Sequence, residues 1–282
     1  MSGEKAVDLH THSTASDGIL TPTQLMQTAA EVGLSGIGLT DHDTTAGLAD
    51  AQTEALRLGL VVVPGVELSA SHHGHEAHML GYFIDPANME FQEKLAAFVK
   101  QRSERIVRMV ERVNQLGIPV ELDAVLEKAG TGTVGRPHLA RVMIDLGAVS
   151  DISDAFNRYL GQGKPAYVPR PRLEPEDAVR LIMSAGGAPV LAHPLSTGDP
   201  REMARRLTPV GLAGLEVWYG EYSPEQRDEL RQLAEANGLI PTGGSDYHGP
   251  NFKPGRDLGG PSVPWETVER LHDASEAIRR MR

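Results

Sequence analysis

Short apolar runs alternate with helical patterns in the first third of the chain. Strands are predicted at residues 6–10, 36–40, 61–64 and 78–84. Between the first two, Thr21 and Pro22 are typical of a helix N-cap and first turn, and Gly33 is typical of a helix end. A second helical pattern covers residues 46–58 and ends at Gly59. This alternation favours a parallel sheet covered by helices.

The middle of the chain follows a different pattern. From residue 89 to residue 160 the sequence is helical in character, with charged stretches such as 100–105. The alternation then returns, with helices predicted at 176–185, 225–237 and 265–281 and strands at 188–192, 213–218 and 239–242. We therefore predict an α/β barrel formed by residues 1–95 and 166–282, with a small helical insertion domain, residues 96–165, covering the active site.

Composition and charge narrow the classes of function. The chain has 27 basic and 38 acidic side chains and a formal net charge of −11, which argues against a broad surface for duplex DNA. No apolar run approaches the ~20 residues of a bilayer helix, and we see no leader, so we expect no membrane association and a cytoplasmic location. The absence of Cys excludes disulfides, thiolate metal ligands and a Cys nucleophile.

Most of the 11 histidines fall near predicted strand ends. His10 and His12 project to the same side of the chain, so both imidazoles can reach one ion. Further His, Asp and Glu side chains follow or open other strands: Asp17, Asp41, His42, Asp43, Glu67, His78, His193, Asp246 and His248. Each of these residues alone has a structural explanation, such as a helix cap. His72, His73 and His75 are explained by a polar loop between strands. Together they predict a metal centre on the C-terminal face of a barrel, and donors without Cys suit Mn, Zn or Fe.

The same segments resemble a known set of motifs. They are L-H-T-H-S at 9–13, S-D-G at 16–18, L-T-D-H-D at 39–43, G-V-E at 65–67, A-H-P at 192–194 and G-S-D-Y-H at 244–248. In this order they resemble the signature of the PHP (polymerase and histidinol phosphatase) superfamily. The resemblance implies a distorted, TIM-like (β/α)7 barrel with two or three divalent metal ions, Mn above all, with Zn, Fe or Mg as alternatives.

The resemblance also implies which residues hold each ion. One ion would take His10, His12, Glu67 and Asp246; a second would share Glu67 and add His78 and His193; a third would take Asp17, His42 and His248. Asp8, Asp41 and Asp43 are interpreted as structural carboxylates, or carboxylates next to the ligands, that orient the imidazoles. Clustered divalent ions lower the pKa of water and offset phosphate charge. Asp17, His193 and His248 are the candidates for passing a proton to the leaving oxygen.

Two segments of the predicted insertion bear on the substrate. G-R-P-H at 135–138 and G-Q-G-K-P-A-Y-V at 161–168 are similar to those of bacterial 3′,5′-nucleoside bisphosphate phosphatases, some of which also trim short RNA from the 5′ end. By that resemblance Arg136, His138 and Lys164 would bind phosphate groups. The aromatic residues at 218, 219 and 222 could stack a base or could belong to the core.

We therefore predict a hydrolase of phosphoric ester bonds that removes the 3′-phosphate of nucleoside 3′,5′-bisphosphates and gives 5′-mononucleotides. Trimming of short RNA in the 5′→3′ direction would overlap with this activity, so the expected partner is a nucleotide or short oligonucleotide. One alternative is a histidinol-phosphate phosphatase, against which the basic pair Arg136 and Lys164 argues. Another is a non-catalytic, metal-stabilised interaction module, against which the complete ligand set argues.

Overall fold

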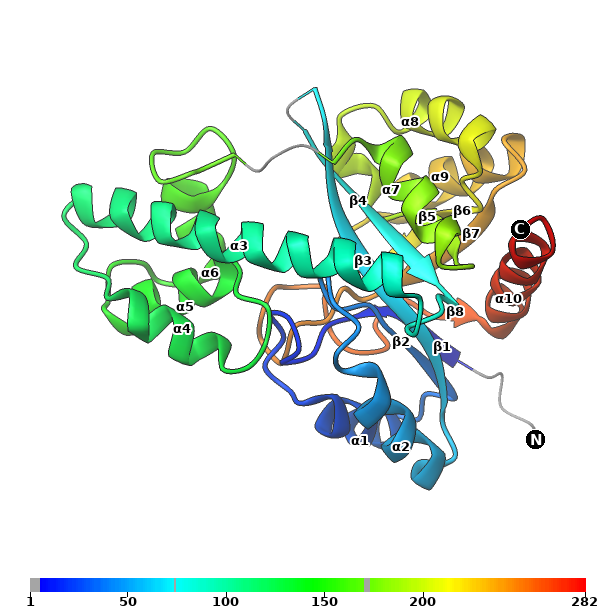
Figure 1. Cartoon of the computed structure of the whole chain (residues 1–282), viewed down its shortest axis with the longest axis horizontal. Coiled ribbons are helices and arrows are strands. Elements are labelled where there is room, and N and C mark those ends of the chain that lie inside the picture. The colour runs from blue at the N-terminus through cyan, green and yellow to red at the C-terminus, as the bar shows by residue number, and fades with distance from the viewer. Residues whose placement is uncertain (1–5, 74, 170–172) are drawn as a thin grey trace.

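A computed structural model describes residues 6–73, 75–169 and 173–282 (Figure 1). The strands of this part of the chain are β1 (Ala6–Thr11), β2 (Gly36–Leu39), β3 (Val61–His72), β4 (His75–Tyr82), β5 (Ala188–Leu191), β6 (Gly214–Tyr219), β7 (Ile240–Gly244) and β8 (Val263–Pro264). They form one sheet in the order β7-β6-β5-β4-β3-β2-β1-β8. Beyond this order, β7 also lies beside β1, because the His12 amide donates to the Tyr247 carbonyl at 2.9 Å. The sheet is therefore a nearly closed barrel, which confirms the predicted fold class.

The expectation of a parallel sheet holds for only part of the barrel. β1, β2 and β3 run parallel, as do β5, β6 and β7. β4 is antiparallel to both its neighbours, β3 and β5, and β8 is antiparallel to β1. Only two residues separate β3 from β4, too few for the crossover that a parallel pair requires. β3 and β4 therefore form a long hairpin, and His72 and His75 are its last paired residues.

Helices cover the outside of the barrel: α1 (Pro22–Glu31), α2 (Leu48–Leu58), α7 (Pro175–Ser184), α8 (Pro200–Leu207), α9 (Pro224–Ala236) and α10 (Trp265–Arg280). α1 begins as predicted, with a capping box between Thr21 and Gln24. The strongly charged α8 was not predicted from its sequence. It begins at Asp199, whose side chain accepts hydrogen bonds from two backbone amides of its first turn. Two short 3₁₀ segments, η2 (Pro194–Thr197) and η3 (Thr208–Val210), flank α8.

A second group of helices lies between β4 and β5 and extends away from the barrel (Figure 1). It consists of α3 (Met89–Gln115), α4 (Leu122–Ala129), α5 (Arg136–Asp145), α6 (Ile152–Ala155) and the π-helical turn η1 (Phe156–Leu160). The first turns of α3 contribute Phe91 and Leu95 to the barrel core, whereas Ile106 and Met109 pack with α4 and α5 in a separate apolar cluster. We propose on this basis that residues 96–165 form an insertion domain.

None of the helices in the described ranges combines the length and the apolar character that a membrane crossing requires.

Candidate active site

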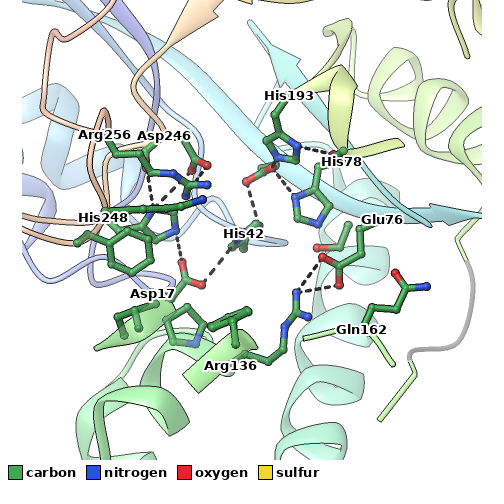
Figure 2. A pocket seen from close by; sticks show the side chains of 18 of the residues that line it. Asp17, His42, Glu76, His78, Arg136, Gln162, His193, Asp246, His248 and Arg256 are labelled. Atoms are coloured by element: carbon green, nitrogen blue, oxygen red, sulfur yellow. Dashed lines mark hydrogen bonds and ion pairs between the residues drawn. The ribbon is translucent and has the colours of Figure 1, made fainter. Parts of the chain in front are cut away.

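A cavity of about 780 Å³ lies between the barrel and the helices that follow β4. Its barrel side carries most of the His, Asp and Glu residues singled out by the sequence, and its other side carries residues of α5, η1 and the segment after η1 (Figure 2). This volume falls within the range of about 300–1,000 Å³ that is usual for small-molecule sites. The cavity is therefore large enough for a nucleotide-sized ligand.

The first cluster of donors combines the ends of β1 and β7 with β3. His10 is the fifth residue of β1 and His12 follows its end, so both rings project to one side, and both are fully buried. Their Nε2 atoms lie 3.3 and 3.2 Å from Glu67 Oε2 and 3.5 and 3.1 Å from Asp246 Oδ1. Four potential ligand atoms thus surround one point, as the resemblance implied.

Glu67 lies at the centre of the site. Its Oε1 lies 2.7 Å from His78 Nδ1 and 3.2 Å from His193 Nε2, and its Oε2 lies 3.1 Å from His42 Nδ1. We expected Glu67 to follow a strand and His78 to open one, but both lie within the hairpin strands. They still reach the site because the hairpin extends past the end of β2, where the Glu67 amide donates to the Asp41 carbonyl at 3.2 Å.

A third group of donors gathers around Asp17. Asp17 Oδ1 lies 3.3 Å from His248 Nε2, and Asp17 Oδ2 lies 3.9 Å from His42 Nε2. His12 Nδ1 faces the same carboxylate at 4.0 Å, so the ring of His12 lies between the first and third groups. The structure therefore brings all nine predicted ligands into one continuous cluster.

The hydrogen bonding of this cluster is suited to divalent cations. Although carboxylate oxygens lie close to imidazole nitrogens here, five buried atoms of the cluster have no partner in hydrogen-bond geometry within the part of the chain that the structure describes: His10 Nε2, both ring nitrogens of His12, His42 Nδ1 and Glu67 Oε2. Burial raises the pKa of Asp17, but His42 and His248 outweigh it and hold that pKa well below its ordinary value. Buried polar atoms without partners are costly, and carboxylates facing imidazole nitrogens are the donors that divalent metal ions prefer. The residues present therefore fit metal ions.

Several of these residues have unusual backbone conformations. Asp43, His193 and Asp246 have positive φ angles of 55°, 26° and 53°. Such conformations are costly for residues other than glycine, and they cluster at functional sites, where the surrounding structure maintains them.

A carboxylate that orients the imidazole of His10 was missed by the sequence analysis. Glu216 in β6 is fully buried; its Oε1 lies 3.0 Å from His10 Nδ1, and its Oε2 accepts a hydrogen bond from the His193 amide at 2.6 Å. Its signal in the sequence is a single carboxylate in the otherwise apolar strand G-L-E-V-W-Y. A hydrogen bond from His10 Nδ1 leaves Nε2 as the ligating atom.

Asp8, Asp41 and Asp43 have structural roles. Asp8 accepts hydrogen bonds from Ser245 and from the Gly259 amide, and Asp41 accepts from Ser13 and Ser16. Burial raises the pKa of Asp41, while the nearby His12 and the Ser hydroxyls oppose that rise. These two carboxylates therefore fix the loops that carry the ligands. Asp43 binds Arg102 of α3 through Arg102 Nε at 2.5 Å, which ties α3 to the barrel.

The three residues expected to bind phosphate occupy different environments. Arg136, at the start of α5, lines the cavity and binds Glu76. His138 is buried outside the cavity wall; its Nδ1 accepts a hydrogen bond from the Gly135 amide at 3.0 Å, and burial lowers its pKa to about 4. Lys164 is exposed and lies outside the cavity lining, where the neighbouring Gln162 is found instead.

The aromatic residues at the end of β6 and just after it are divided between core and cavity. Trp218 is partly buried against the apolar core, whereas Tyr219 and Tyr222 line the cavity. The Tyr219 hydroxyl donates to Asp246 Oδ2 at 3.0 Å. Arg256, which sequence reasoning also missed, reaches the same oxygen with Nη1 at 2.7 Å, so two groups fix the orientation of this carboxylate.

Comparisons with known proteins agree with this geometry. The family described as PHP domain matches residues 8–122. The 5′-3′ exoribonuclease Rnm of Escherichia coli (strain K12) is 37% identical over 249 residues, which are 86% of this chain and 85% of the relative. The 3′,5′-nucleoside bisphosphate phosphatase of Chromobacterium violaceum is 38% identical over 258 residues, 90% of each chain. The chain belongs to the PHP family.

A solved structure supports the same assignment for the fold. A protein from Bifidobacterium adolescentis, described as a metal-dependent phosphoesterase, superimposes with a TM-score of 0.88 at 34% identity, and the match covers 96% of each chain. This chain is therefore a metal-dependent phosphohydrolase of the PHP family, an enzyme that acts on phosphate esters. The comparisons support this prediction and neither of its alternatives, the histidinol-phosphate phosphatase and the non-catalytic module.

Proposed function

We propose that this PHP phosphohydrolase removes the 3′-phosphate of nucleoside 3′,5′-bisphosphates and releases 5′-mononucleotides. The observation that carries the proposal is the pairing of two elements in one cavity: the ligand cluster on the barrel side, which would bind an anion through its metal ions, and Arg136 on the helical side. A substrate with two separated phosphate groups can contact both. The relative from Chromobacterium violaceum, named for this class of substrate, supports the proposal.

Nine residues are proposed to hold two or three divalent ions: His10, His12, Asp17, His42, Glu67, His78, His193, Asp246 and His248. The ions would supply an activated water and neutralise charge on the phosphoryl group. We favour Mn²⁺, with Zn, Fe or Mg as alternatives, because the donors are imidazoles and carboxylates and the chain has no Cys. Metal content of the purified protein, measured by elemental analysis, tests this assignment.

The chain's own groups would position the ester and manage the proton. Asp17, His193 and His248 all line the cavity, so they can reach the leaving 3′-oxygen. His193 and His248 are the proposed proton donors, and Asp17, whose pKa is held well below its ordinary value, would accept a proton and pass it on. His10 and His12 lie behind them, fully buried, and would only hold metal. The Arg136 guanidinium would bind the second phosphate through two parallel hydrogen bonds.

The test is release of inorganic phosphate from adenosine 3′,5′-bisphosphate in the presence of Mn²⁺. We expect adenosine 5′-monophosphate as the product, with slower turnover of 3′-monophosphates that lack the second phosphate. No turnover of the bisphosphate, or equal turnover of every phosphomonoester, contradicts the proposal. Arg136→Ala should raise KM or lower kcat with the metal content unchanged, whereas Arg201→Ala, on the exposed side of α8, should change neither.

A second candidate activity is 5′→3′ removal of nucleotides from short RNA. The relative from Escherichia coli, named as a 5′-3′ exoribonuclease, supports it. The two activities require the same ligand cluster and differ in the leaving group. Di- and trinucleotides carrying a 5′-phosphate separate them, because an enzyme restricted to mononucleotides would leave these substrates intact.

A further inference from the structure

Arg136, the proposed phosphate ligand, already has an anionic partner inside the cavity. Both carboxylate oxygens of Glu76 contact Arg136 Nη2, at 2.8 and 2.9 Å (Figure 2). Both residues line the cavity, so this ion pair occupies the place where a substrate phosphate would bind. Glu76 is therefore a competitor for Arg136 as well as its neighbour.

Glu76 belongs to the part of the hairpin that extends beyond the barrel. It pairs with Ser71 of β3, whereas β4 contacts β5 only from Met79 to Tyr82. Because side chains alternate along a strand, Glu76 projects to the same face as His78, two residues along β4. A single strand thus carries one proposed metal ligand and the partner of Arg136.

The Arg136–Glu76 pair is more exposed than the pairs that hold Asp43 and Asp246, and in this respect it resembles the pair of Glu221 with Lys253. The Glu76 side chain is 34% exposed, whereas the side chains of Asp43 and Asp246, which bind Arg102 and Arg256, are 1% and 6% exposed. A carboxylate that is 34% exposed regains part of its hydration when it leaves its partner, so its release costs less than the release of a fully buried one. A fully buried carboxylate that left its partner would remain charged and without hydration, at a much larger cost in free energy.

Arg136 itself is held in place independently of Glu76. Its guanidinium lies over the ring of Phe156, 5.1 Å from the ring centre, and its side chain is 14% exposed. Phe156 is the first residue of the π-helical turn η1, a rare conformation that is frequent at functional sites. Stacking on an aromatic ring leaves the hydrogen-bonding edge of a guanidinium available for a second ligand.

We propose that Glu76 occupies Arg136 before substrate binds, that the distal phosphate of the substrate displaces it, and that Glu76 returns to Arg136 as product leaves. This inference rests on the proposed function, because it assigns the second phosphate to Arg136. A phosphate dianion offers more charge and more acceptor oxygens than a carboxylate, which favours the exchange. The return of Glu76 weakens retention of the 5′-mononucleotide, which still carries the phosphate bound by Arg136.

The test is binding of adenosine 5′-monophosphate to the metal-loaded protein, measured by calorimetry and as product inhibition. Glu76→Gln removes the charge and keeps the size, so the dissociation constant should fall by about two- to fivefold, the range set by loss of one partly exposed ion pair. A merely positioning role for Glu76 predicts the opposite sign, because Arg136 would then lose its orientation. Unchanged or weaker binding by Glu76→Gln overturns the proposal.

Three controls assign the effect to Arg136. Glu54→Gln breaks a comparable ion pair with Arg57, outside the cavity, and should leave the dissociation constant unchanged. Inorganic orthophosphate, which can bind at the metal cluster alone, should bind Glu76→Gln and the parent protein with equal affinity. If Glu76→Gln instead gains the same affinity for orthophosphate as for adenosine 5′-monophosphate, the effect is one of general charge and the proposal is overturned. In an Arg136→Gln background the Glu76 substitution should give no gain.

The two proposals fail in different ways. If the parent protein hydrolyses no nucleoside bisphosphate, the proposed function is wrong, and the binding comparison still decides whether Glu76 competes at Arg136. If the bisphosphate is hydrolysed while Glu76→Gln binds the mononucleotide no better, the function stands and the exchange is wrong.

Discussion

Replacing Glu216 by Gln tests whether Glu216 fixes the tautomer of His10 that can bind a metal ion through Nε2. Glu216 accepts two hydrogen bonds with its two oxygens, one from His10 Nδ1 at 3.0 Å and one from the His193 amide at 2.6 Å. The side chain is fully buried, so no water replaces a lost partner. Gln has nearly the same shape but only one oxygen, so one of the two contacts must fail.

The magnitude follows from which contact fails. If the Gln oxygen faces the His193 amide, its NH₂ group faces His10 Nδ1 and moves the ring proton to Nε2, the atom that faces Glu67 and Asp246. If the Gln is reversed, the His193 amide loses its acceptor, at a cost of about 1–3 kcal/mol. Either outcome corresponds to a loss of about 10- to 100-fold in metal affinity.

The assay is retention of Mn²⁺ during titration with a competing chelator, read by elemental analysis, with phosphate release followed in parallel. Glu216→Gln should lose metal at lower chelator concentration, and excess Mn²⁺ should restore turnover. Glu225→Gln, exposed at the start of α9, should behave as the parent protein. If Glu216→Gln holds metal as tightly as the parent protein, the reasoning on tautomer control is refuted.

Two further predictions concern stability. The pKa of His138 is lowered to about 4 by burial, against about 6.5 for an exposed His, so the unfolded chain binds the extra proton first and stability falls as pH drops below about 6.5. Urea unfolding measures the free energy of unfolding at pH 7 and at pH 5. Between these two pH values the parent protein should lose about 2 kcal/mol more than His138→Gln, a variant that keeps an acceptor for the Gly135 amide. Equal losses in the two proteins would contradict the assignment. A Cβ at Gly220 would lie 1.6 Å from the Gly255 carbonyl oxygen, so Gly220→Ala should displace the loop that carries Arg256 and lower stability by about 1–3 kcal/mol, together with substrate affinity. Gly33→Ala, where a Cβ meets no atom within 4 Å but φ is +81°, should lower stability alone, and an equal effect of both variants on substrate affinity would contradict the role of the loop.

The ligand cluster could be predicted because its donors sit at fixed places in local patterns. His10 and His12 end a short apolar run, and Asp246 and His248 follow another, so the carboxyl ends of parallel strands place them on one face. The hairpin was harder to predict. The polar alternation from Glu67 to His72 does not extend the apolar run before it, so the strand was expected to stop at residue 64.

The groups that act on the ligands could not be predicted in the same way. Arg256 meets Asp246 because Gly220 and Gly255 allow two loops to touch, and no local pattern records that contact. Glu76 meets Arg136 across 60 residues of chain, through the placement of α5 against the hairpin. Both pairs depend on tertiary packing between elements, whereas strand ends and helix caps depend on the few residues around them.

The hairpin sets a spacing that can select substrates by the distance between their phosphate groups. Glu76 and His78 project from the same face of β4, and two residues of a strand span about 7 Å. Glu76, the partner of Arg136, and His78, a proposed metal ligand, are therefore spaced along a single strand. We expect a substrate that reaches both Arg136 and the metal cluster to carry its phosphates on separate carbons of a sugar. Pyrophosphate, whose phosphorus atoms share one oxygen, is shorter than this spacing, and a single phosphomonoester can engage only one of the two sites at a time. Substrate selection in this protein would thus depend on the spacing of two anionic groups, with the base contributing less.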